Sequence, residues 1–331
     1  MKALIKSFVE TYGPAGSEEQ IRSLIEAEIS GHVDEVRTDA LGNLIAVKKG
    51  DGSGIKVMLA AHMDEIGLIV THIDDKGFLR FNSVGGVSPH VLLGQRVIFG
   101  NGVVGAVGAE KLDHIKDLRL DKMYIDIGAD SKGEAEERVR VGHTCAIHRF
   151  MDDLGSRVVS KAMDDRIACA VLVEALKRID GTPHDVYFVF TVQEEVGLRG
   201  ARTAAYSIDP DLGIAIDVTR TGDTPESITM DVRLGGGAAI KVKDSSMITH
   251  PKVKRLLADT AEAGGIPYQF EVLEHGGTDA GAIHLSRQGV PSGTISIPCR
   301  YIHTPTEMID MGDVKACVDL VVAVLSEPID I

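Results

Sequence analysis

The sequence predicts an α/β fold, in which a mostly parallel, mixed sheet is flanked by helices and carries a small inserted β-barrel. Three observations predict it. Helix-like and strand-like patterns alternate in both end regions of the chain, which is typical of parallel sheets. Two apolar runs, at residues 55–61 and 187–192, are nearly continuous, as expected of strands covered on both faces. Residues 67–157 instead show short strand-like segments between Gly, Asp and Asn turns, a texture typical of a small barrel or sandwich.

The change of texture divides the chain into two expected domains. Residues 1–66 and 158–331 form one discontinuous α/β domain, and residues 67–157 form the inserted β domain. Turn residues separate the expected strands of the inserted domain, which lie at residues 67–73, 78–82, 96–99 and 102–107.

Periodicity and end signals place the elements of the α/β domain. Ser17 and Gln20 have the spacing of a capping box, so a helix is expected to begin at Ser17. Apolar residues at helical spacing predict helices at residues 2–12, 17–29, 164–179, 251–264, 278–288 and 313–325. Short apolar runs predict strands at residues 33–38, 44–48, 55–61, 185–192, 212–217, 239–243, 268–273 and 294–297.

Composition and charge narrow the function. The chain has 331 residues, of which 44% are hydrophobic, and its formal net charge is −14. Such an acidic chain is a poor partner for nucleic acid or for an anionic membrane surface. The four cysteines are scattered and form no CxxC motif, which argues against a disulfide framework or a cysteine zinc site. No apolar run has the length of a membrane span and the first residues do not read as a secretory signal, so we expect a cytoplasmic protein.

Side chains that can bind metal ions cluster where the predicted strands end. Each has an ordinary explanation when taken alone, such as a helix cap or a solvated acidic turn. However, sites in open parallel sheets form at the carboxyl ends of the strands, so these residues are expected to converge. The candidates are His62, Asp64, Asp164, Asp165, Glu194, Glu195, Asp217 and His303.

Two histidines and several carboxylates are ligands that suit Zn, Co or Mn. There are enough of them for two divalent ions, about 3.5–4 Å apart, with one carboxylate shared between them. Glu194 and Glu195 are neighbours, so the residues alone do not decide which of the two binds metal and which moves a proton.

Five segments together resemble a known family, the dinuclear-metal aminopeptidases that build tetrahedral particles, also called glutamyl or deblocking aminopeptidases. They occur in the order and approximate spacing of that family, and the resemblance covers essentially the whole chain, including the inserted β domain. The segments are residues 60–67 (AAHMDEIG), 162–166 (AMDDR), 193–197 (QEEVG), 215–217 (AID) and 301–305 (YIHTP).

The resemblance implies a role for each candidate. His62, Asp164 and Asp217 would hold one metal ion, and Glu195, His303 and the shared Asp164 would hold the other. Asp64 matches the carboxylate that orients the imidazole of His62. Glu194 would be the general base that activates water and later protonates the leaving amine.

The same resemblance implies a catalytic domain of the zinc-exopeptidase type that removes the N-terminal residue of short peptides with a free amine. It also implies that the inserted domain pairs subunits, and that six such dimers form a dodecamer. Three alternatives stay open at this point: another dinuclear amidohydrolase (a carboxypeptidase or a deacylase), a glycosidase that uses Glu194 and a second acid, and a non-catalytic peptide-binding particle. Relatives of this family have been labelled endoglucanases.

Overall fold

The computed structural model describes residues 1–331, and it contains one large sheet and one closed barrel. The sheet has eleven strands, and nine of them follow the order β1-β2-β12-β3-β13-β16-β17-β11-β10. Its strands are β1 (Glu35–Thr38), β2 (Leu44–Lys48), β3 (Lys56–His62), β10 (Asp152–Asp153), β11 (Arg157–Ser160), β12 (Asp185–Thr191), β13 (Leu212–Thr219), β14 (Ala238–Lys243), β15 (Tyr268–Val272), β16 (Ser292–Arg300) and β17 (Glu307–Asp310).

The central strands of the sheet run parallel to one another, so their carboxyl ends, which carry polar residues, lie together. Strand β3 pairs in parallel with β12 on one side and with β13 on the other, and β13 pairs in parallel with β16. The outer strands β1, β2, β17, β11 and β10 run antiparallel to their neighbours. The predicted mixed sheet is confirmed, and the carboxyl ends of four central strands share one edge.

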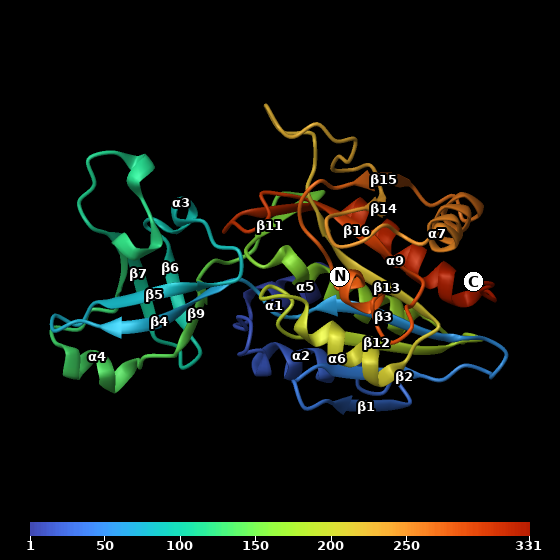
Figure 1. The fold of residues 1–331 in the computed structure, drawn as a ribbon, viewed down its shortest axis with the longest axis horizontal. Helices are drawn as coiled ribbons and strands as arrows, with labels where there is room; N and C mark the ends of the chain where they lie inside the picture. Colours follow the sequence, from blue (N-terminus) through green and yellow to red (C-terminus); the bar gives the residue numbers. More distant parts are fainter.

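Helices cover both faces of this sheet (Figure 1). On one face α5 packs on β3 and β13 and contacts α1, α2 and α9, while α7 packs on β14 and α9. On the other face α6 and α8 pack together over β12, β13 and β3. The helices are α1 (Lys2–Glu10), α2 (Glu19–Ile29), α5 (Met163–Arg178), α6 (Arg199–Ile208), α7 (Pro251–Ala263), α8 (Ala280–Ile283) and α9 (Met311–Ser326). None of the helices combines the length and the apolar character that a bilayer crossing requires.

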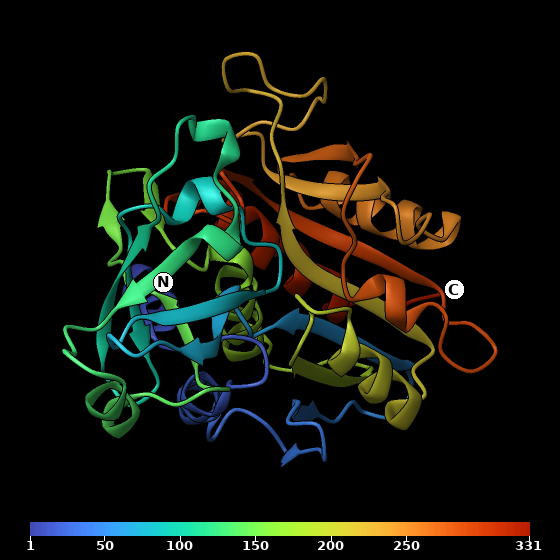
Figure 2. The same ribbon diagram turned by 60° about the vertical axis from the view of Figure 1, so that its left-hand side comes forward.

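The barrel lies beside the α/β part, at the left of Figure 1, and Figure 2 brings it forward. It closes in the order β4-β5-β8-β7-β6-β9 and has its own hydrophobic core. Its strands are β4 (Gly67–Ile73), β5 (Leu79–Val84), β6 (Arg96–Phe99), β7 (Val104–Ala109), β8 (Met123–Asp126) and β9 (Thr144–Ile147), with two short helices, α3 (Pro89–Leu92) and α4 (Lys132–Arg138).

Buried ion pairs tie together the two places where the chain leaves the large sheet for the barrel and returns to it. Lys161 Nζ lies 2.7 Å from Glu65 Oε2, and both side chains are almost fully buried. Arg166, which is fully buried, lies 3.5 Å from Glu65 Oε1. The same guanidinium donates hydrogen bonds to four backbone carbonyls, those of Phe8, Thr11, Gly13 and Met63.

Two local predictions are wrong. Ser17 does not cap the second helix, which begins at Glu19. Its hydroxyl instead forms a hydrogen bond with the barrel residue Thr144 at 2.9 Å. The helix expected over residues 278–288 is reduced to α8, because Thr278 and Asp279 are drawn into the interior and Arg287 adopts a positive φ of 50°.

Candidate metal centre

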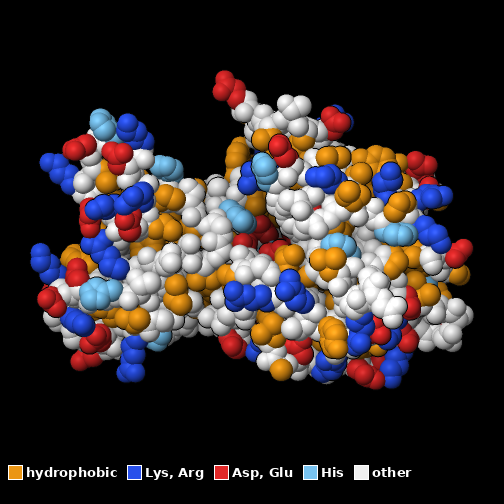
Figure 3. All heavy atoms as spheres, viewed as in Figure 1, with side chains coloured by type: hydrophobic (Ala, Val, Ile, Leu, Met, Phe, Trp, Pro, Cys, Tyr) orange, Lys and Arg blue, Asp and Glu red, His pale blue; other side chains and the backbone are white.

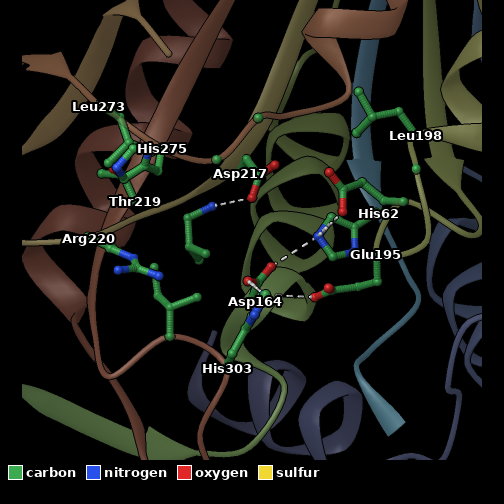
Figure 4. Close-up of a pocket in the computed structure, with 16 residues that line it drawn as sticks. His62, Asp164, Glu195, Leu198, Asp217, Thr219, Arg220, Leu273, His275 and His303 are labelled. Carbon is green, nitrogen blue, oxygen red and sulfur yellow. Dashed lines mark hydrogen bonds and ion pairs between the residues drawn. The ribbon is translucent and has the colours of Figure 1, made fainter. Parts of the chain in front are cut away.

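The candidate ligands converge at the shared edge of the central strands, as the sequence predicts. His62 is the last residue of β3, and Asp217 lies near the end of β13. Glu194 and Glu195 lie in the turn after β12, and His303 lies in the loop between β16 and β17. Asp164 reaches the same place from the start of α5. Figure 4 shows His62, Asp164, Glu195, Asp217 and His303 around one cavity.

Asp164 is the centre of this arrangement. His62 Nε2 lies 3.0 Å from Asp164 Oδ1, and His303 Nε2 lies 3.2 Å from Asp164 Oδ2. His303 Nε2 is also 3.2 Å from Glu195 Oε1. Each carboxylate oxygen of Asp164 therefore faces a different imidazole, an arrangement that suits a carboxylate shared between two ions.

A second group of potential ligands includes a residue to which we assigned no role. Ligand atoms of His62, Asp165 and Asp217 lie within 4.8 Å of one another. Asp165 is completely buried, and neither of its carboxylate oxygens has a hydrogen-bond partner. The one signal in the sequence was its position next to Asp164, which does not distinguish a ligand from a neighbour.

Burial and the mutual repulsion of acids dominate the electrostatics of the centre. Burial raises the pKa of Glu194 and of Asp217 well above the usual range, and repulsion from neighbouring carboxylates raises both further. Burial opposes protonation of His303, yet its hydrogen bonds to Asp164 and Glu195 outweigh burial and raise the imidazole pKa to about 11.

This donor set fits divalent ions. Imidazole nitrogens and carboxylate oxygens dominate it, and no thiolate is present: the Cys169 thiol next to it is buried, which raises its pKa well above the usual value. Both carboxylate oxygens of Asp165 are buried and lack hydrogen-bond partners. Buried carboxylates normally have partners, so these atoms are consistent with ligands of an ion.

Asp64 holds the acidic turn in place. Its Oδ1 accepts a hydrogen bond from the backbone N–H of Glu194 at 3.0 Å, and its Oδ2 accepts one from that of Glu195 at 3.1 Å. His62 Nδ1 lies 3.6 Å from Asp64 Oδ1 and 3.1 Å from the Asp64 backbone oxygen. Asp64 therefore touches both the imidazole and the turn that carries the two glutamates.

The centre opens into a cavity of about 380 Å³. Figure 3 shows acidic side chains recessed in a hollow near the middle of this face. Beyond the candidate ligands, the wall consists mainly of Leu198, Thr219, Arg220, Leu273, Ile302 and the segment 275–277. Arg220 forms no ion pair, so its positive charge is free to meet a ligand.

Comparison with known proteins finds relatives that match most of the chain. The family of M42 glutamyl aminopeptidases matches residues 42–320. An Acetivibrio thermocellus protein, named provisionally as an aminopeptidase, is 57% identical over 96% of this chain and 96% of its own length. The lysyl aminopeptidase of Pyrococcus furiosus is 37% identical over 98% of this chain and 96% of its own.

Solved structures agree over the same length. Aminopeptidase APDkam598 from Desulfurococcus kamchatkensis superposes with a TM-score of 0.93 at 42% identity, covering 98% of this chain and 94% of that one. The Pyrococcus horikoshii TET1 peptidase, described as assembling into a tetrahedron or an octahedral shell, gives 0.88 at 35% identity over 98% and 99%. The chain belongs to the M42 glutamyl aminopeptidase family and is a peptide-bond hydrolase of the aminopeptidase type.

Proposed function

We propose that the chain hydrolyses the N-terminal residue from short peptides by means of two divalent ions, zinc or cobalt, with manganese as a further option. His62, Asp164 and Asp217 would hold one ion, and Glu195, His303 and Asp164 the other. The observation that carries the proposal is the position of Asp164, whose two oxygens lie 3.0 and 3.2 Å from the two imidazoles. Ions bound there supply Lewis acidity to the scissile carbonyl and lower the pKa of the attacking water.

Glu194 is the proposed general base. It lines the cavity, and its Oε2 forms a long ion pair with His62 Nε2 at 3.9 Å, beyond hydrogen-bonding distance. Burial and neighbouring acids raise its pKa well above the usual range, which makes the carboxylate a stronger base toward water than an exposed glutamate. The same carboxyl then returns the proton to the leaving amine.

Asp64 is proposed to assist catalysis by holding His62, Glu194 and Glu195 in position. Its carboxylate keeps the backbone of Glu194 and Glu195 fixed and lies beside the imidazole of His62. An outer carboxylate of this kind orients its neighbouring ligand and raises the basicity of that ligand.

The decisive assay compares peptides with both ends free, with a blocked amine and with a blocked carboxylate. An aminopeptidase cleaves the first and third and spares the second, whereas a carboxypeptidase spares the third. Chelation should abolish the activity, and reloading with Zn or Co should restore it. Hydrolysis of a glucan that survives chelation would instead support the glycosidase reading, because that chemistry needs two carboxyls and no metal.

A particle of twelve chains is proposed, together with a cytoplasmic location. The rotations of a tetrahedron generate twelve copies, arranged as six pairs on two-fold axes, and the barrel, which has its own core, is the proposed pairing domain. The tetrahedral assembly described for the P. horikoshii peptidase supports this proposal. The four cysteines are all unpaired, which suits a reducing compartment.

A further inference from the structure

Glu307, the first residue of β17, joins two distant ligand segments. Its Oε2 accepts a hydrogen bond from the backbone N–H of Asp164 at 3.0 Å, and its Oε1 accepts one from the backbone N–H of His303 at 2.8 Å. The side chain is 2% exposed and forms no ion pair. One buried carboxylate therefore contacts the backbone of both Asp164 and His303, the two residues that are proposed to bind the same ion.

Strand pairing explains how one side chain reaches both. Glu307 lies opposite Ser160 in the antiparallel pair of β17 and β11. Strand β11 leads into the segment that carries Asp164, and the loop that carries His303 ends where β17 begins. The start of β17 thus lies beside both segments.

The His303 loop needs such an anchor. His303 and Tyr301 both adopt positive φ values, 63° and 62°, in the left-handed region that non-glycine residues avoid. That conformation is unfavourable for such residues and persists where surrounding contacts fix it. The bond from the His303 N–H to Glu307 is such a contact.

Only a carboxylate satisfies both donors. It accepts at both oxygens and donates at neither, whereas an amide of the same shape would direct an N–H group toward one of the two backbone N–H groups. The side chain of Glu307 is buried, so the fold carries an acid in an unfavourable environment. Packing alone would be served better by an apolar side chain.

We propose that Glu307 is a positioning residue of the metal centre, which fixes the backbone of Asp164 and of His303 so that their side chains meet at one ion. Asp64 does the same for the backbone of Glu194 and Glu195. The inference rests on the ligands assigned under the proposed function. It assigns Glu307 no contact with substrate.

The expected effect is on ion binding. Loss of a residue that orients a ligand typically weakens metal affinity by about 10–100-fold. Glu307→Gln should bind the ion between Asp164 and His303 that much more weakly, and its cobalt form should show a changed visible spectrum, because the ligands around the ion are displaced. Turnover should fall with a smaller change in KM, because the substrate wall is untouched.

The chain offers a matched control. Asp313 is also a buried carboxylate that accepts two backbone N–H bonds, from Gly235 at 2.8 Å and from Gly237 at 2.7 Å, but neither glycine lines the cavity. Asp313→Asn should lose stability as Glu307→Gln does and should keep the metal affinity and the cobalt spectrum of the wild type. Glu307→Asp keeps the charge but is too short to reach both N–H groups, and it should behave like Glu307→Gln.

The experiment measures dissociation constants for Co²⁺ by chelator competition, cobalt absorption spectra and unfolding in urea for the wild type and the three variants. A wild type that binds no Co²⁺ would overturn the proposed function itself. If the wild type binds Co²⁺, wild-type affinity and spectrum in Glu307→Gln overturn the positioning role alone. An equal loss of affinity in Asp313→Asn also overturns it, because the effect would then be general. If Glu307→Gln does not fold, Glu307→Asp decides in the same way.

Discussion

Metal binding to this site should release protons, and its strength should therefore rise with pH. In the metal-free fold, Asp164 and Glu195 raise the pKa of His303 to about 11, and neighbouring carboxylates raise that of His62 well above its usual value. Both imidazoles then carry a proton near neutral pH, and each must lose it to bind an ion. Because the protons compete less as pH rises, affinity increases throughout the range below these pKa values.

The size of the effect follows from the number of protons. One displaced proton changes the association constant about tenfold per pH unit, so loss of the two imidazole protons should change the combined constant by at least about a hundredfold per unit between roughly pH 6 and 8, and the raised pKa of the ligand Asp217 adds to this slope. Calorimetric titration of Co²⁺ in two buffers of different protonation enthalpy counts the protons directly. In His303→Gln the slope should fall by about one proton.

Equal dissociation constants across this pH range, or injection heats that do not depend on the buffer, would refute the reasoning. Either result would mean that the imidazoles are neutral before the ions bind. The clustered carboxylates would then not control the charge of the site.

Four further outcomes are expected. Glu194→Gln should keep both ions and lose about 10²–10⁴-fold in kcat, whereas Glu195→Gln should lose one ion, as metal analysis beside a peptidase assay would show. Arg220→Ala should lower kcat/KM for substrates with an N-terminal Glu more than for those with Leu, because the unpaired guanidinium attracts the acidic side chain. Arg166→Met should destabilise the fold by about 3–5 kcal/mol in urea unfolding, since Glu65 loses a buried partner. The 35.4 kDa chain should elute as a particle of about 425 kDa in gel filtration.

Each of these has a contrary result. Full activity in Glu194→Gln, or retention of two ions in Glu195→Gln, would remove the assigned roles. Equal losses of kcat/KM on substrates with N-terminal Glu and Leu would mean that Arg220 does not recognise the charge of the substrate side chain. An unchanged urea midpoint in Arg166→Met would show that water replaces the hydrogen bonds of the arginine. Elution of the chain as a dimer would mean that the barrel pairs two subunits and that the pairs do not assemble further.

Much of the centre could be predicted because its residues follow apolar strands. His62, Glu195 and Asp217 each lie at or just after such a run, so strand direction alone brings them together. Glu307 gives no comparable signal. Its partners are the backbone N–H groups of one residue 143 positions away and one four positions away, and no side-chain pattern records a backbone bond.

Two helices of the fold could not be predicted correctly from the sequence, for related reasons. Helix α6 was not predicted: its buried face consists largely of small residues, Gly200, Ala201, Ala204 and Ala205, with Ile208 as its one large apolar side chain. The helix expected at residues 278–288 shortened because Thr191 donates a hydrogen bond to Asp279 and holds the segment inward. Both helices depend on contacts with residues distant in the sequence, and local periodicity does not show such contacts.

The buried pair of Lys161 and Glu65 has a consequence for how such a chain can change over time. The pair, with 2.7 Å between Lys161 Nζ and Glu65 Oε2, joins the segment that leads into the barrel to the segment that returns from it. Insertions or deletions in barrel loops remote from that junction would leave His62 and Asp164, on either side of it, where they are. Exchange of the whole barrel would not be neutral, because Gly85 and Gly86 pack closely against Glu195 and His303, and a side chain at either position would displace a residue of the centre.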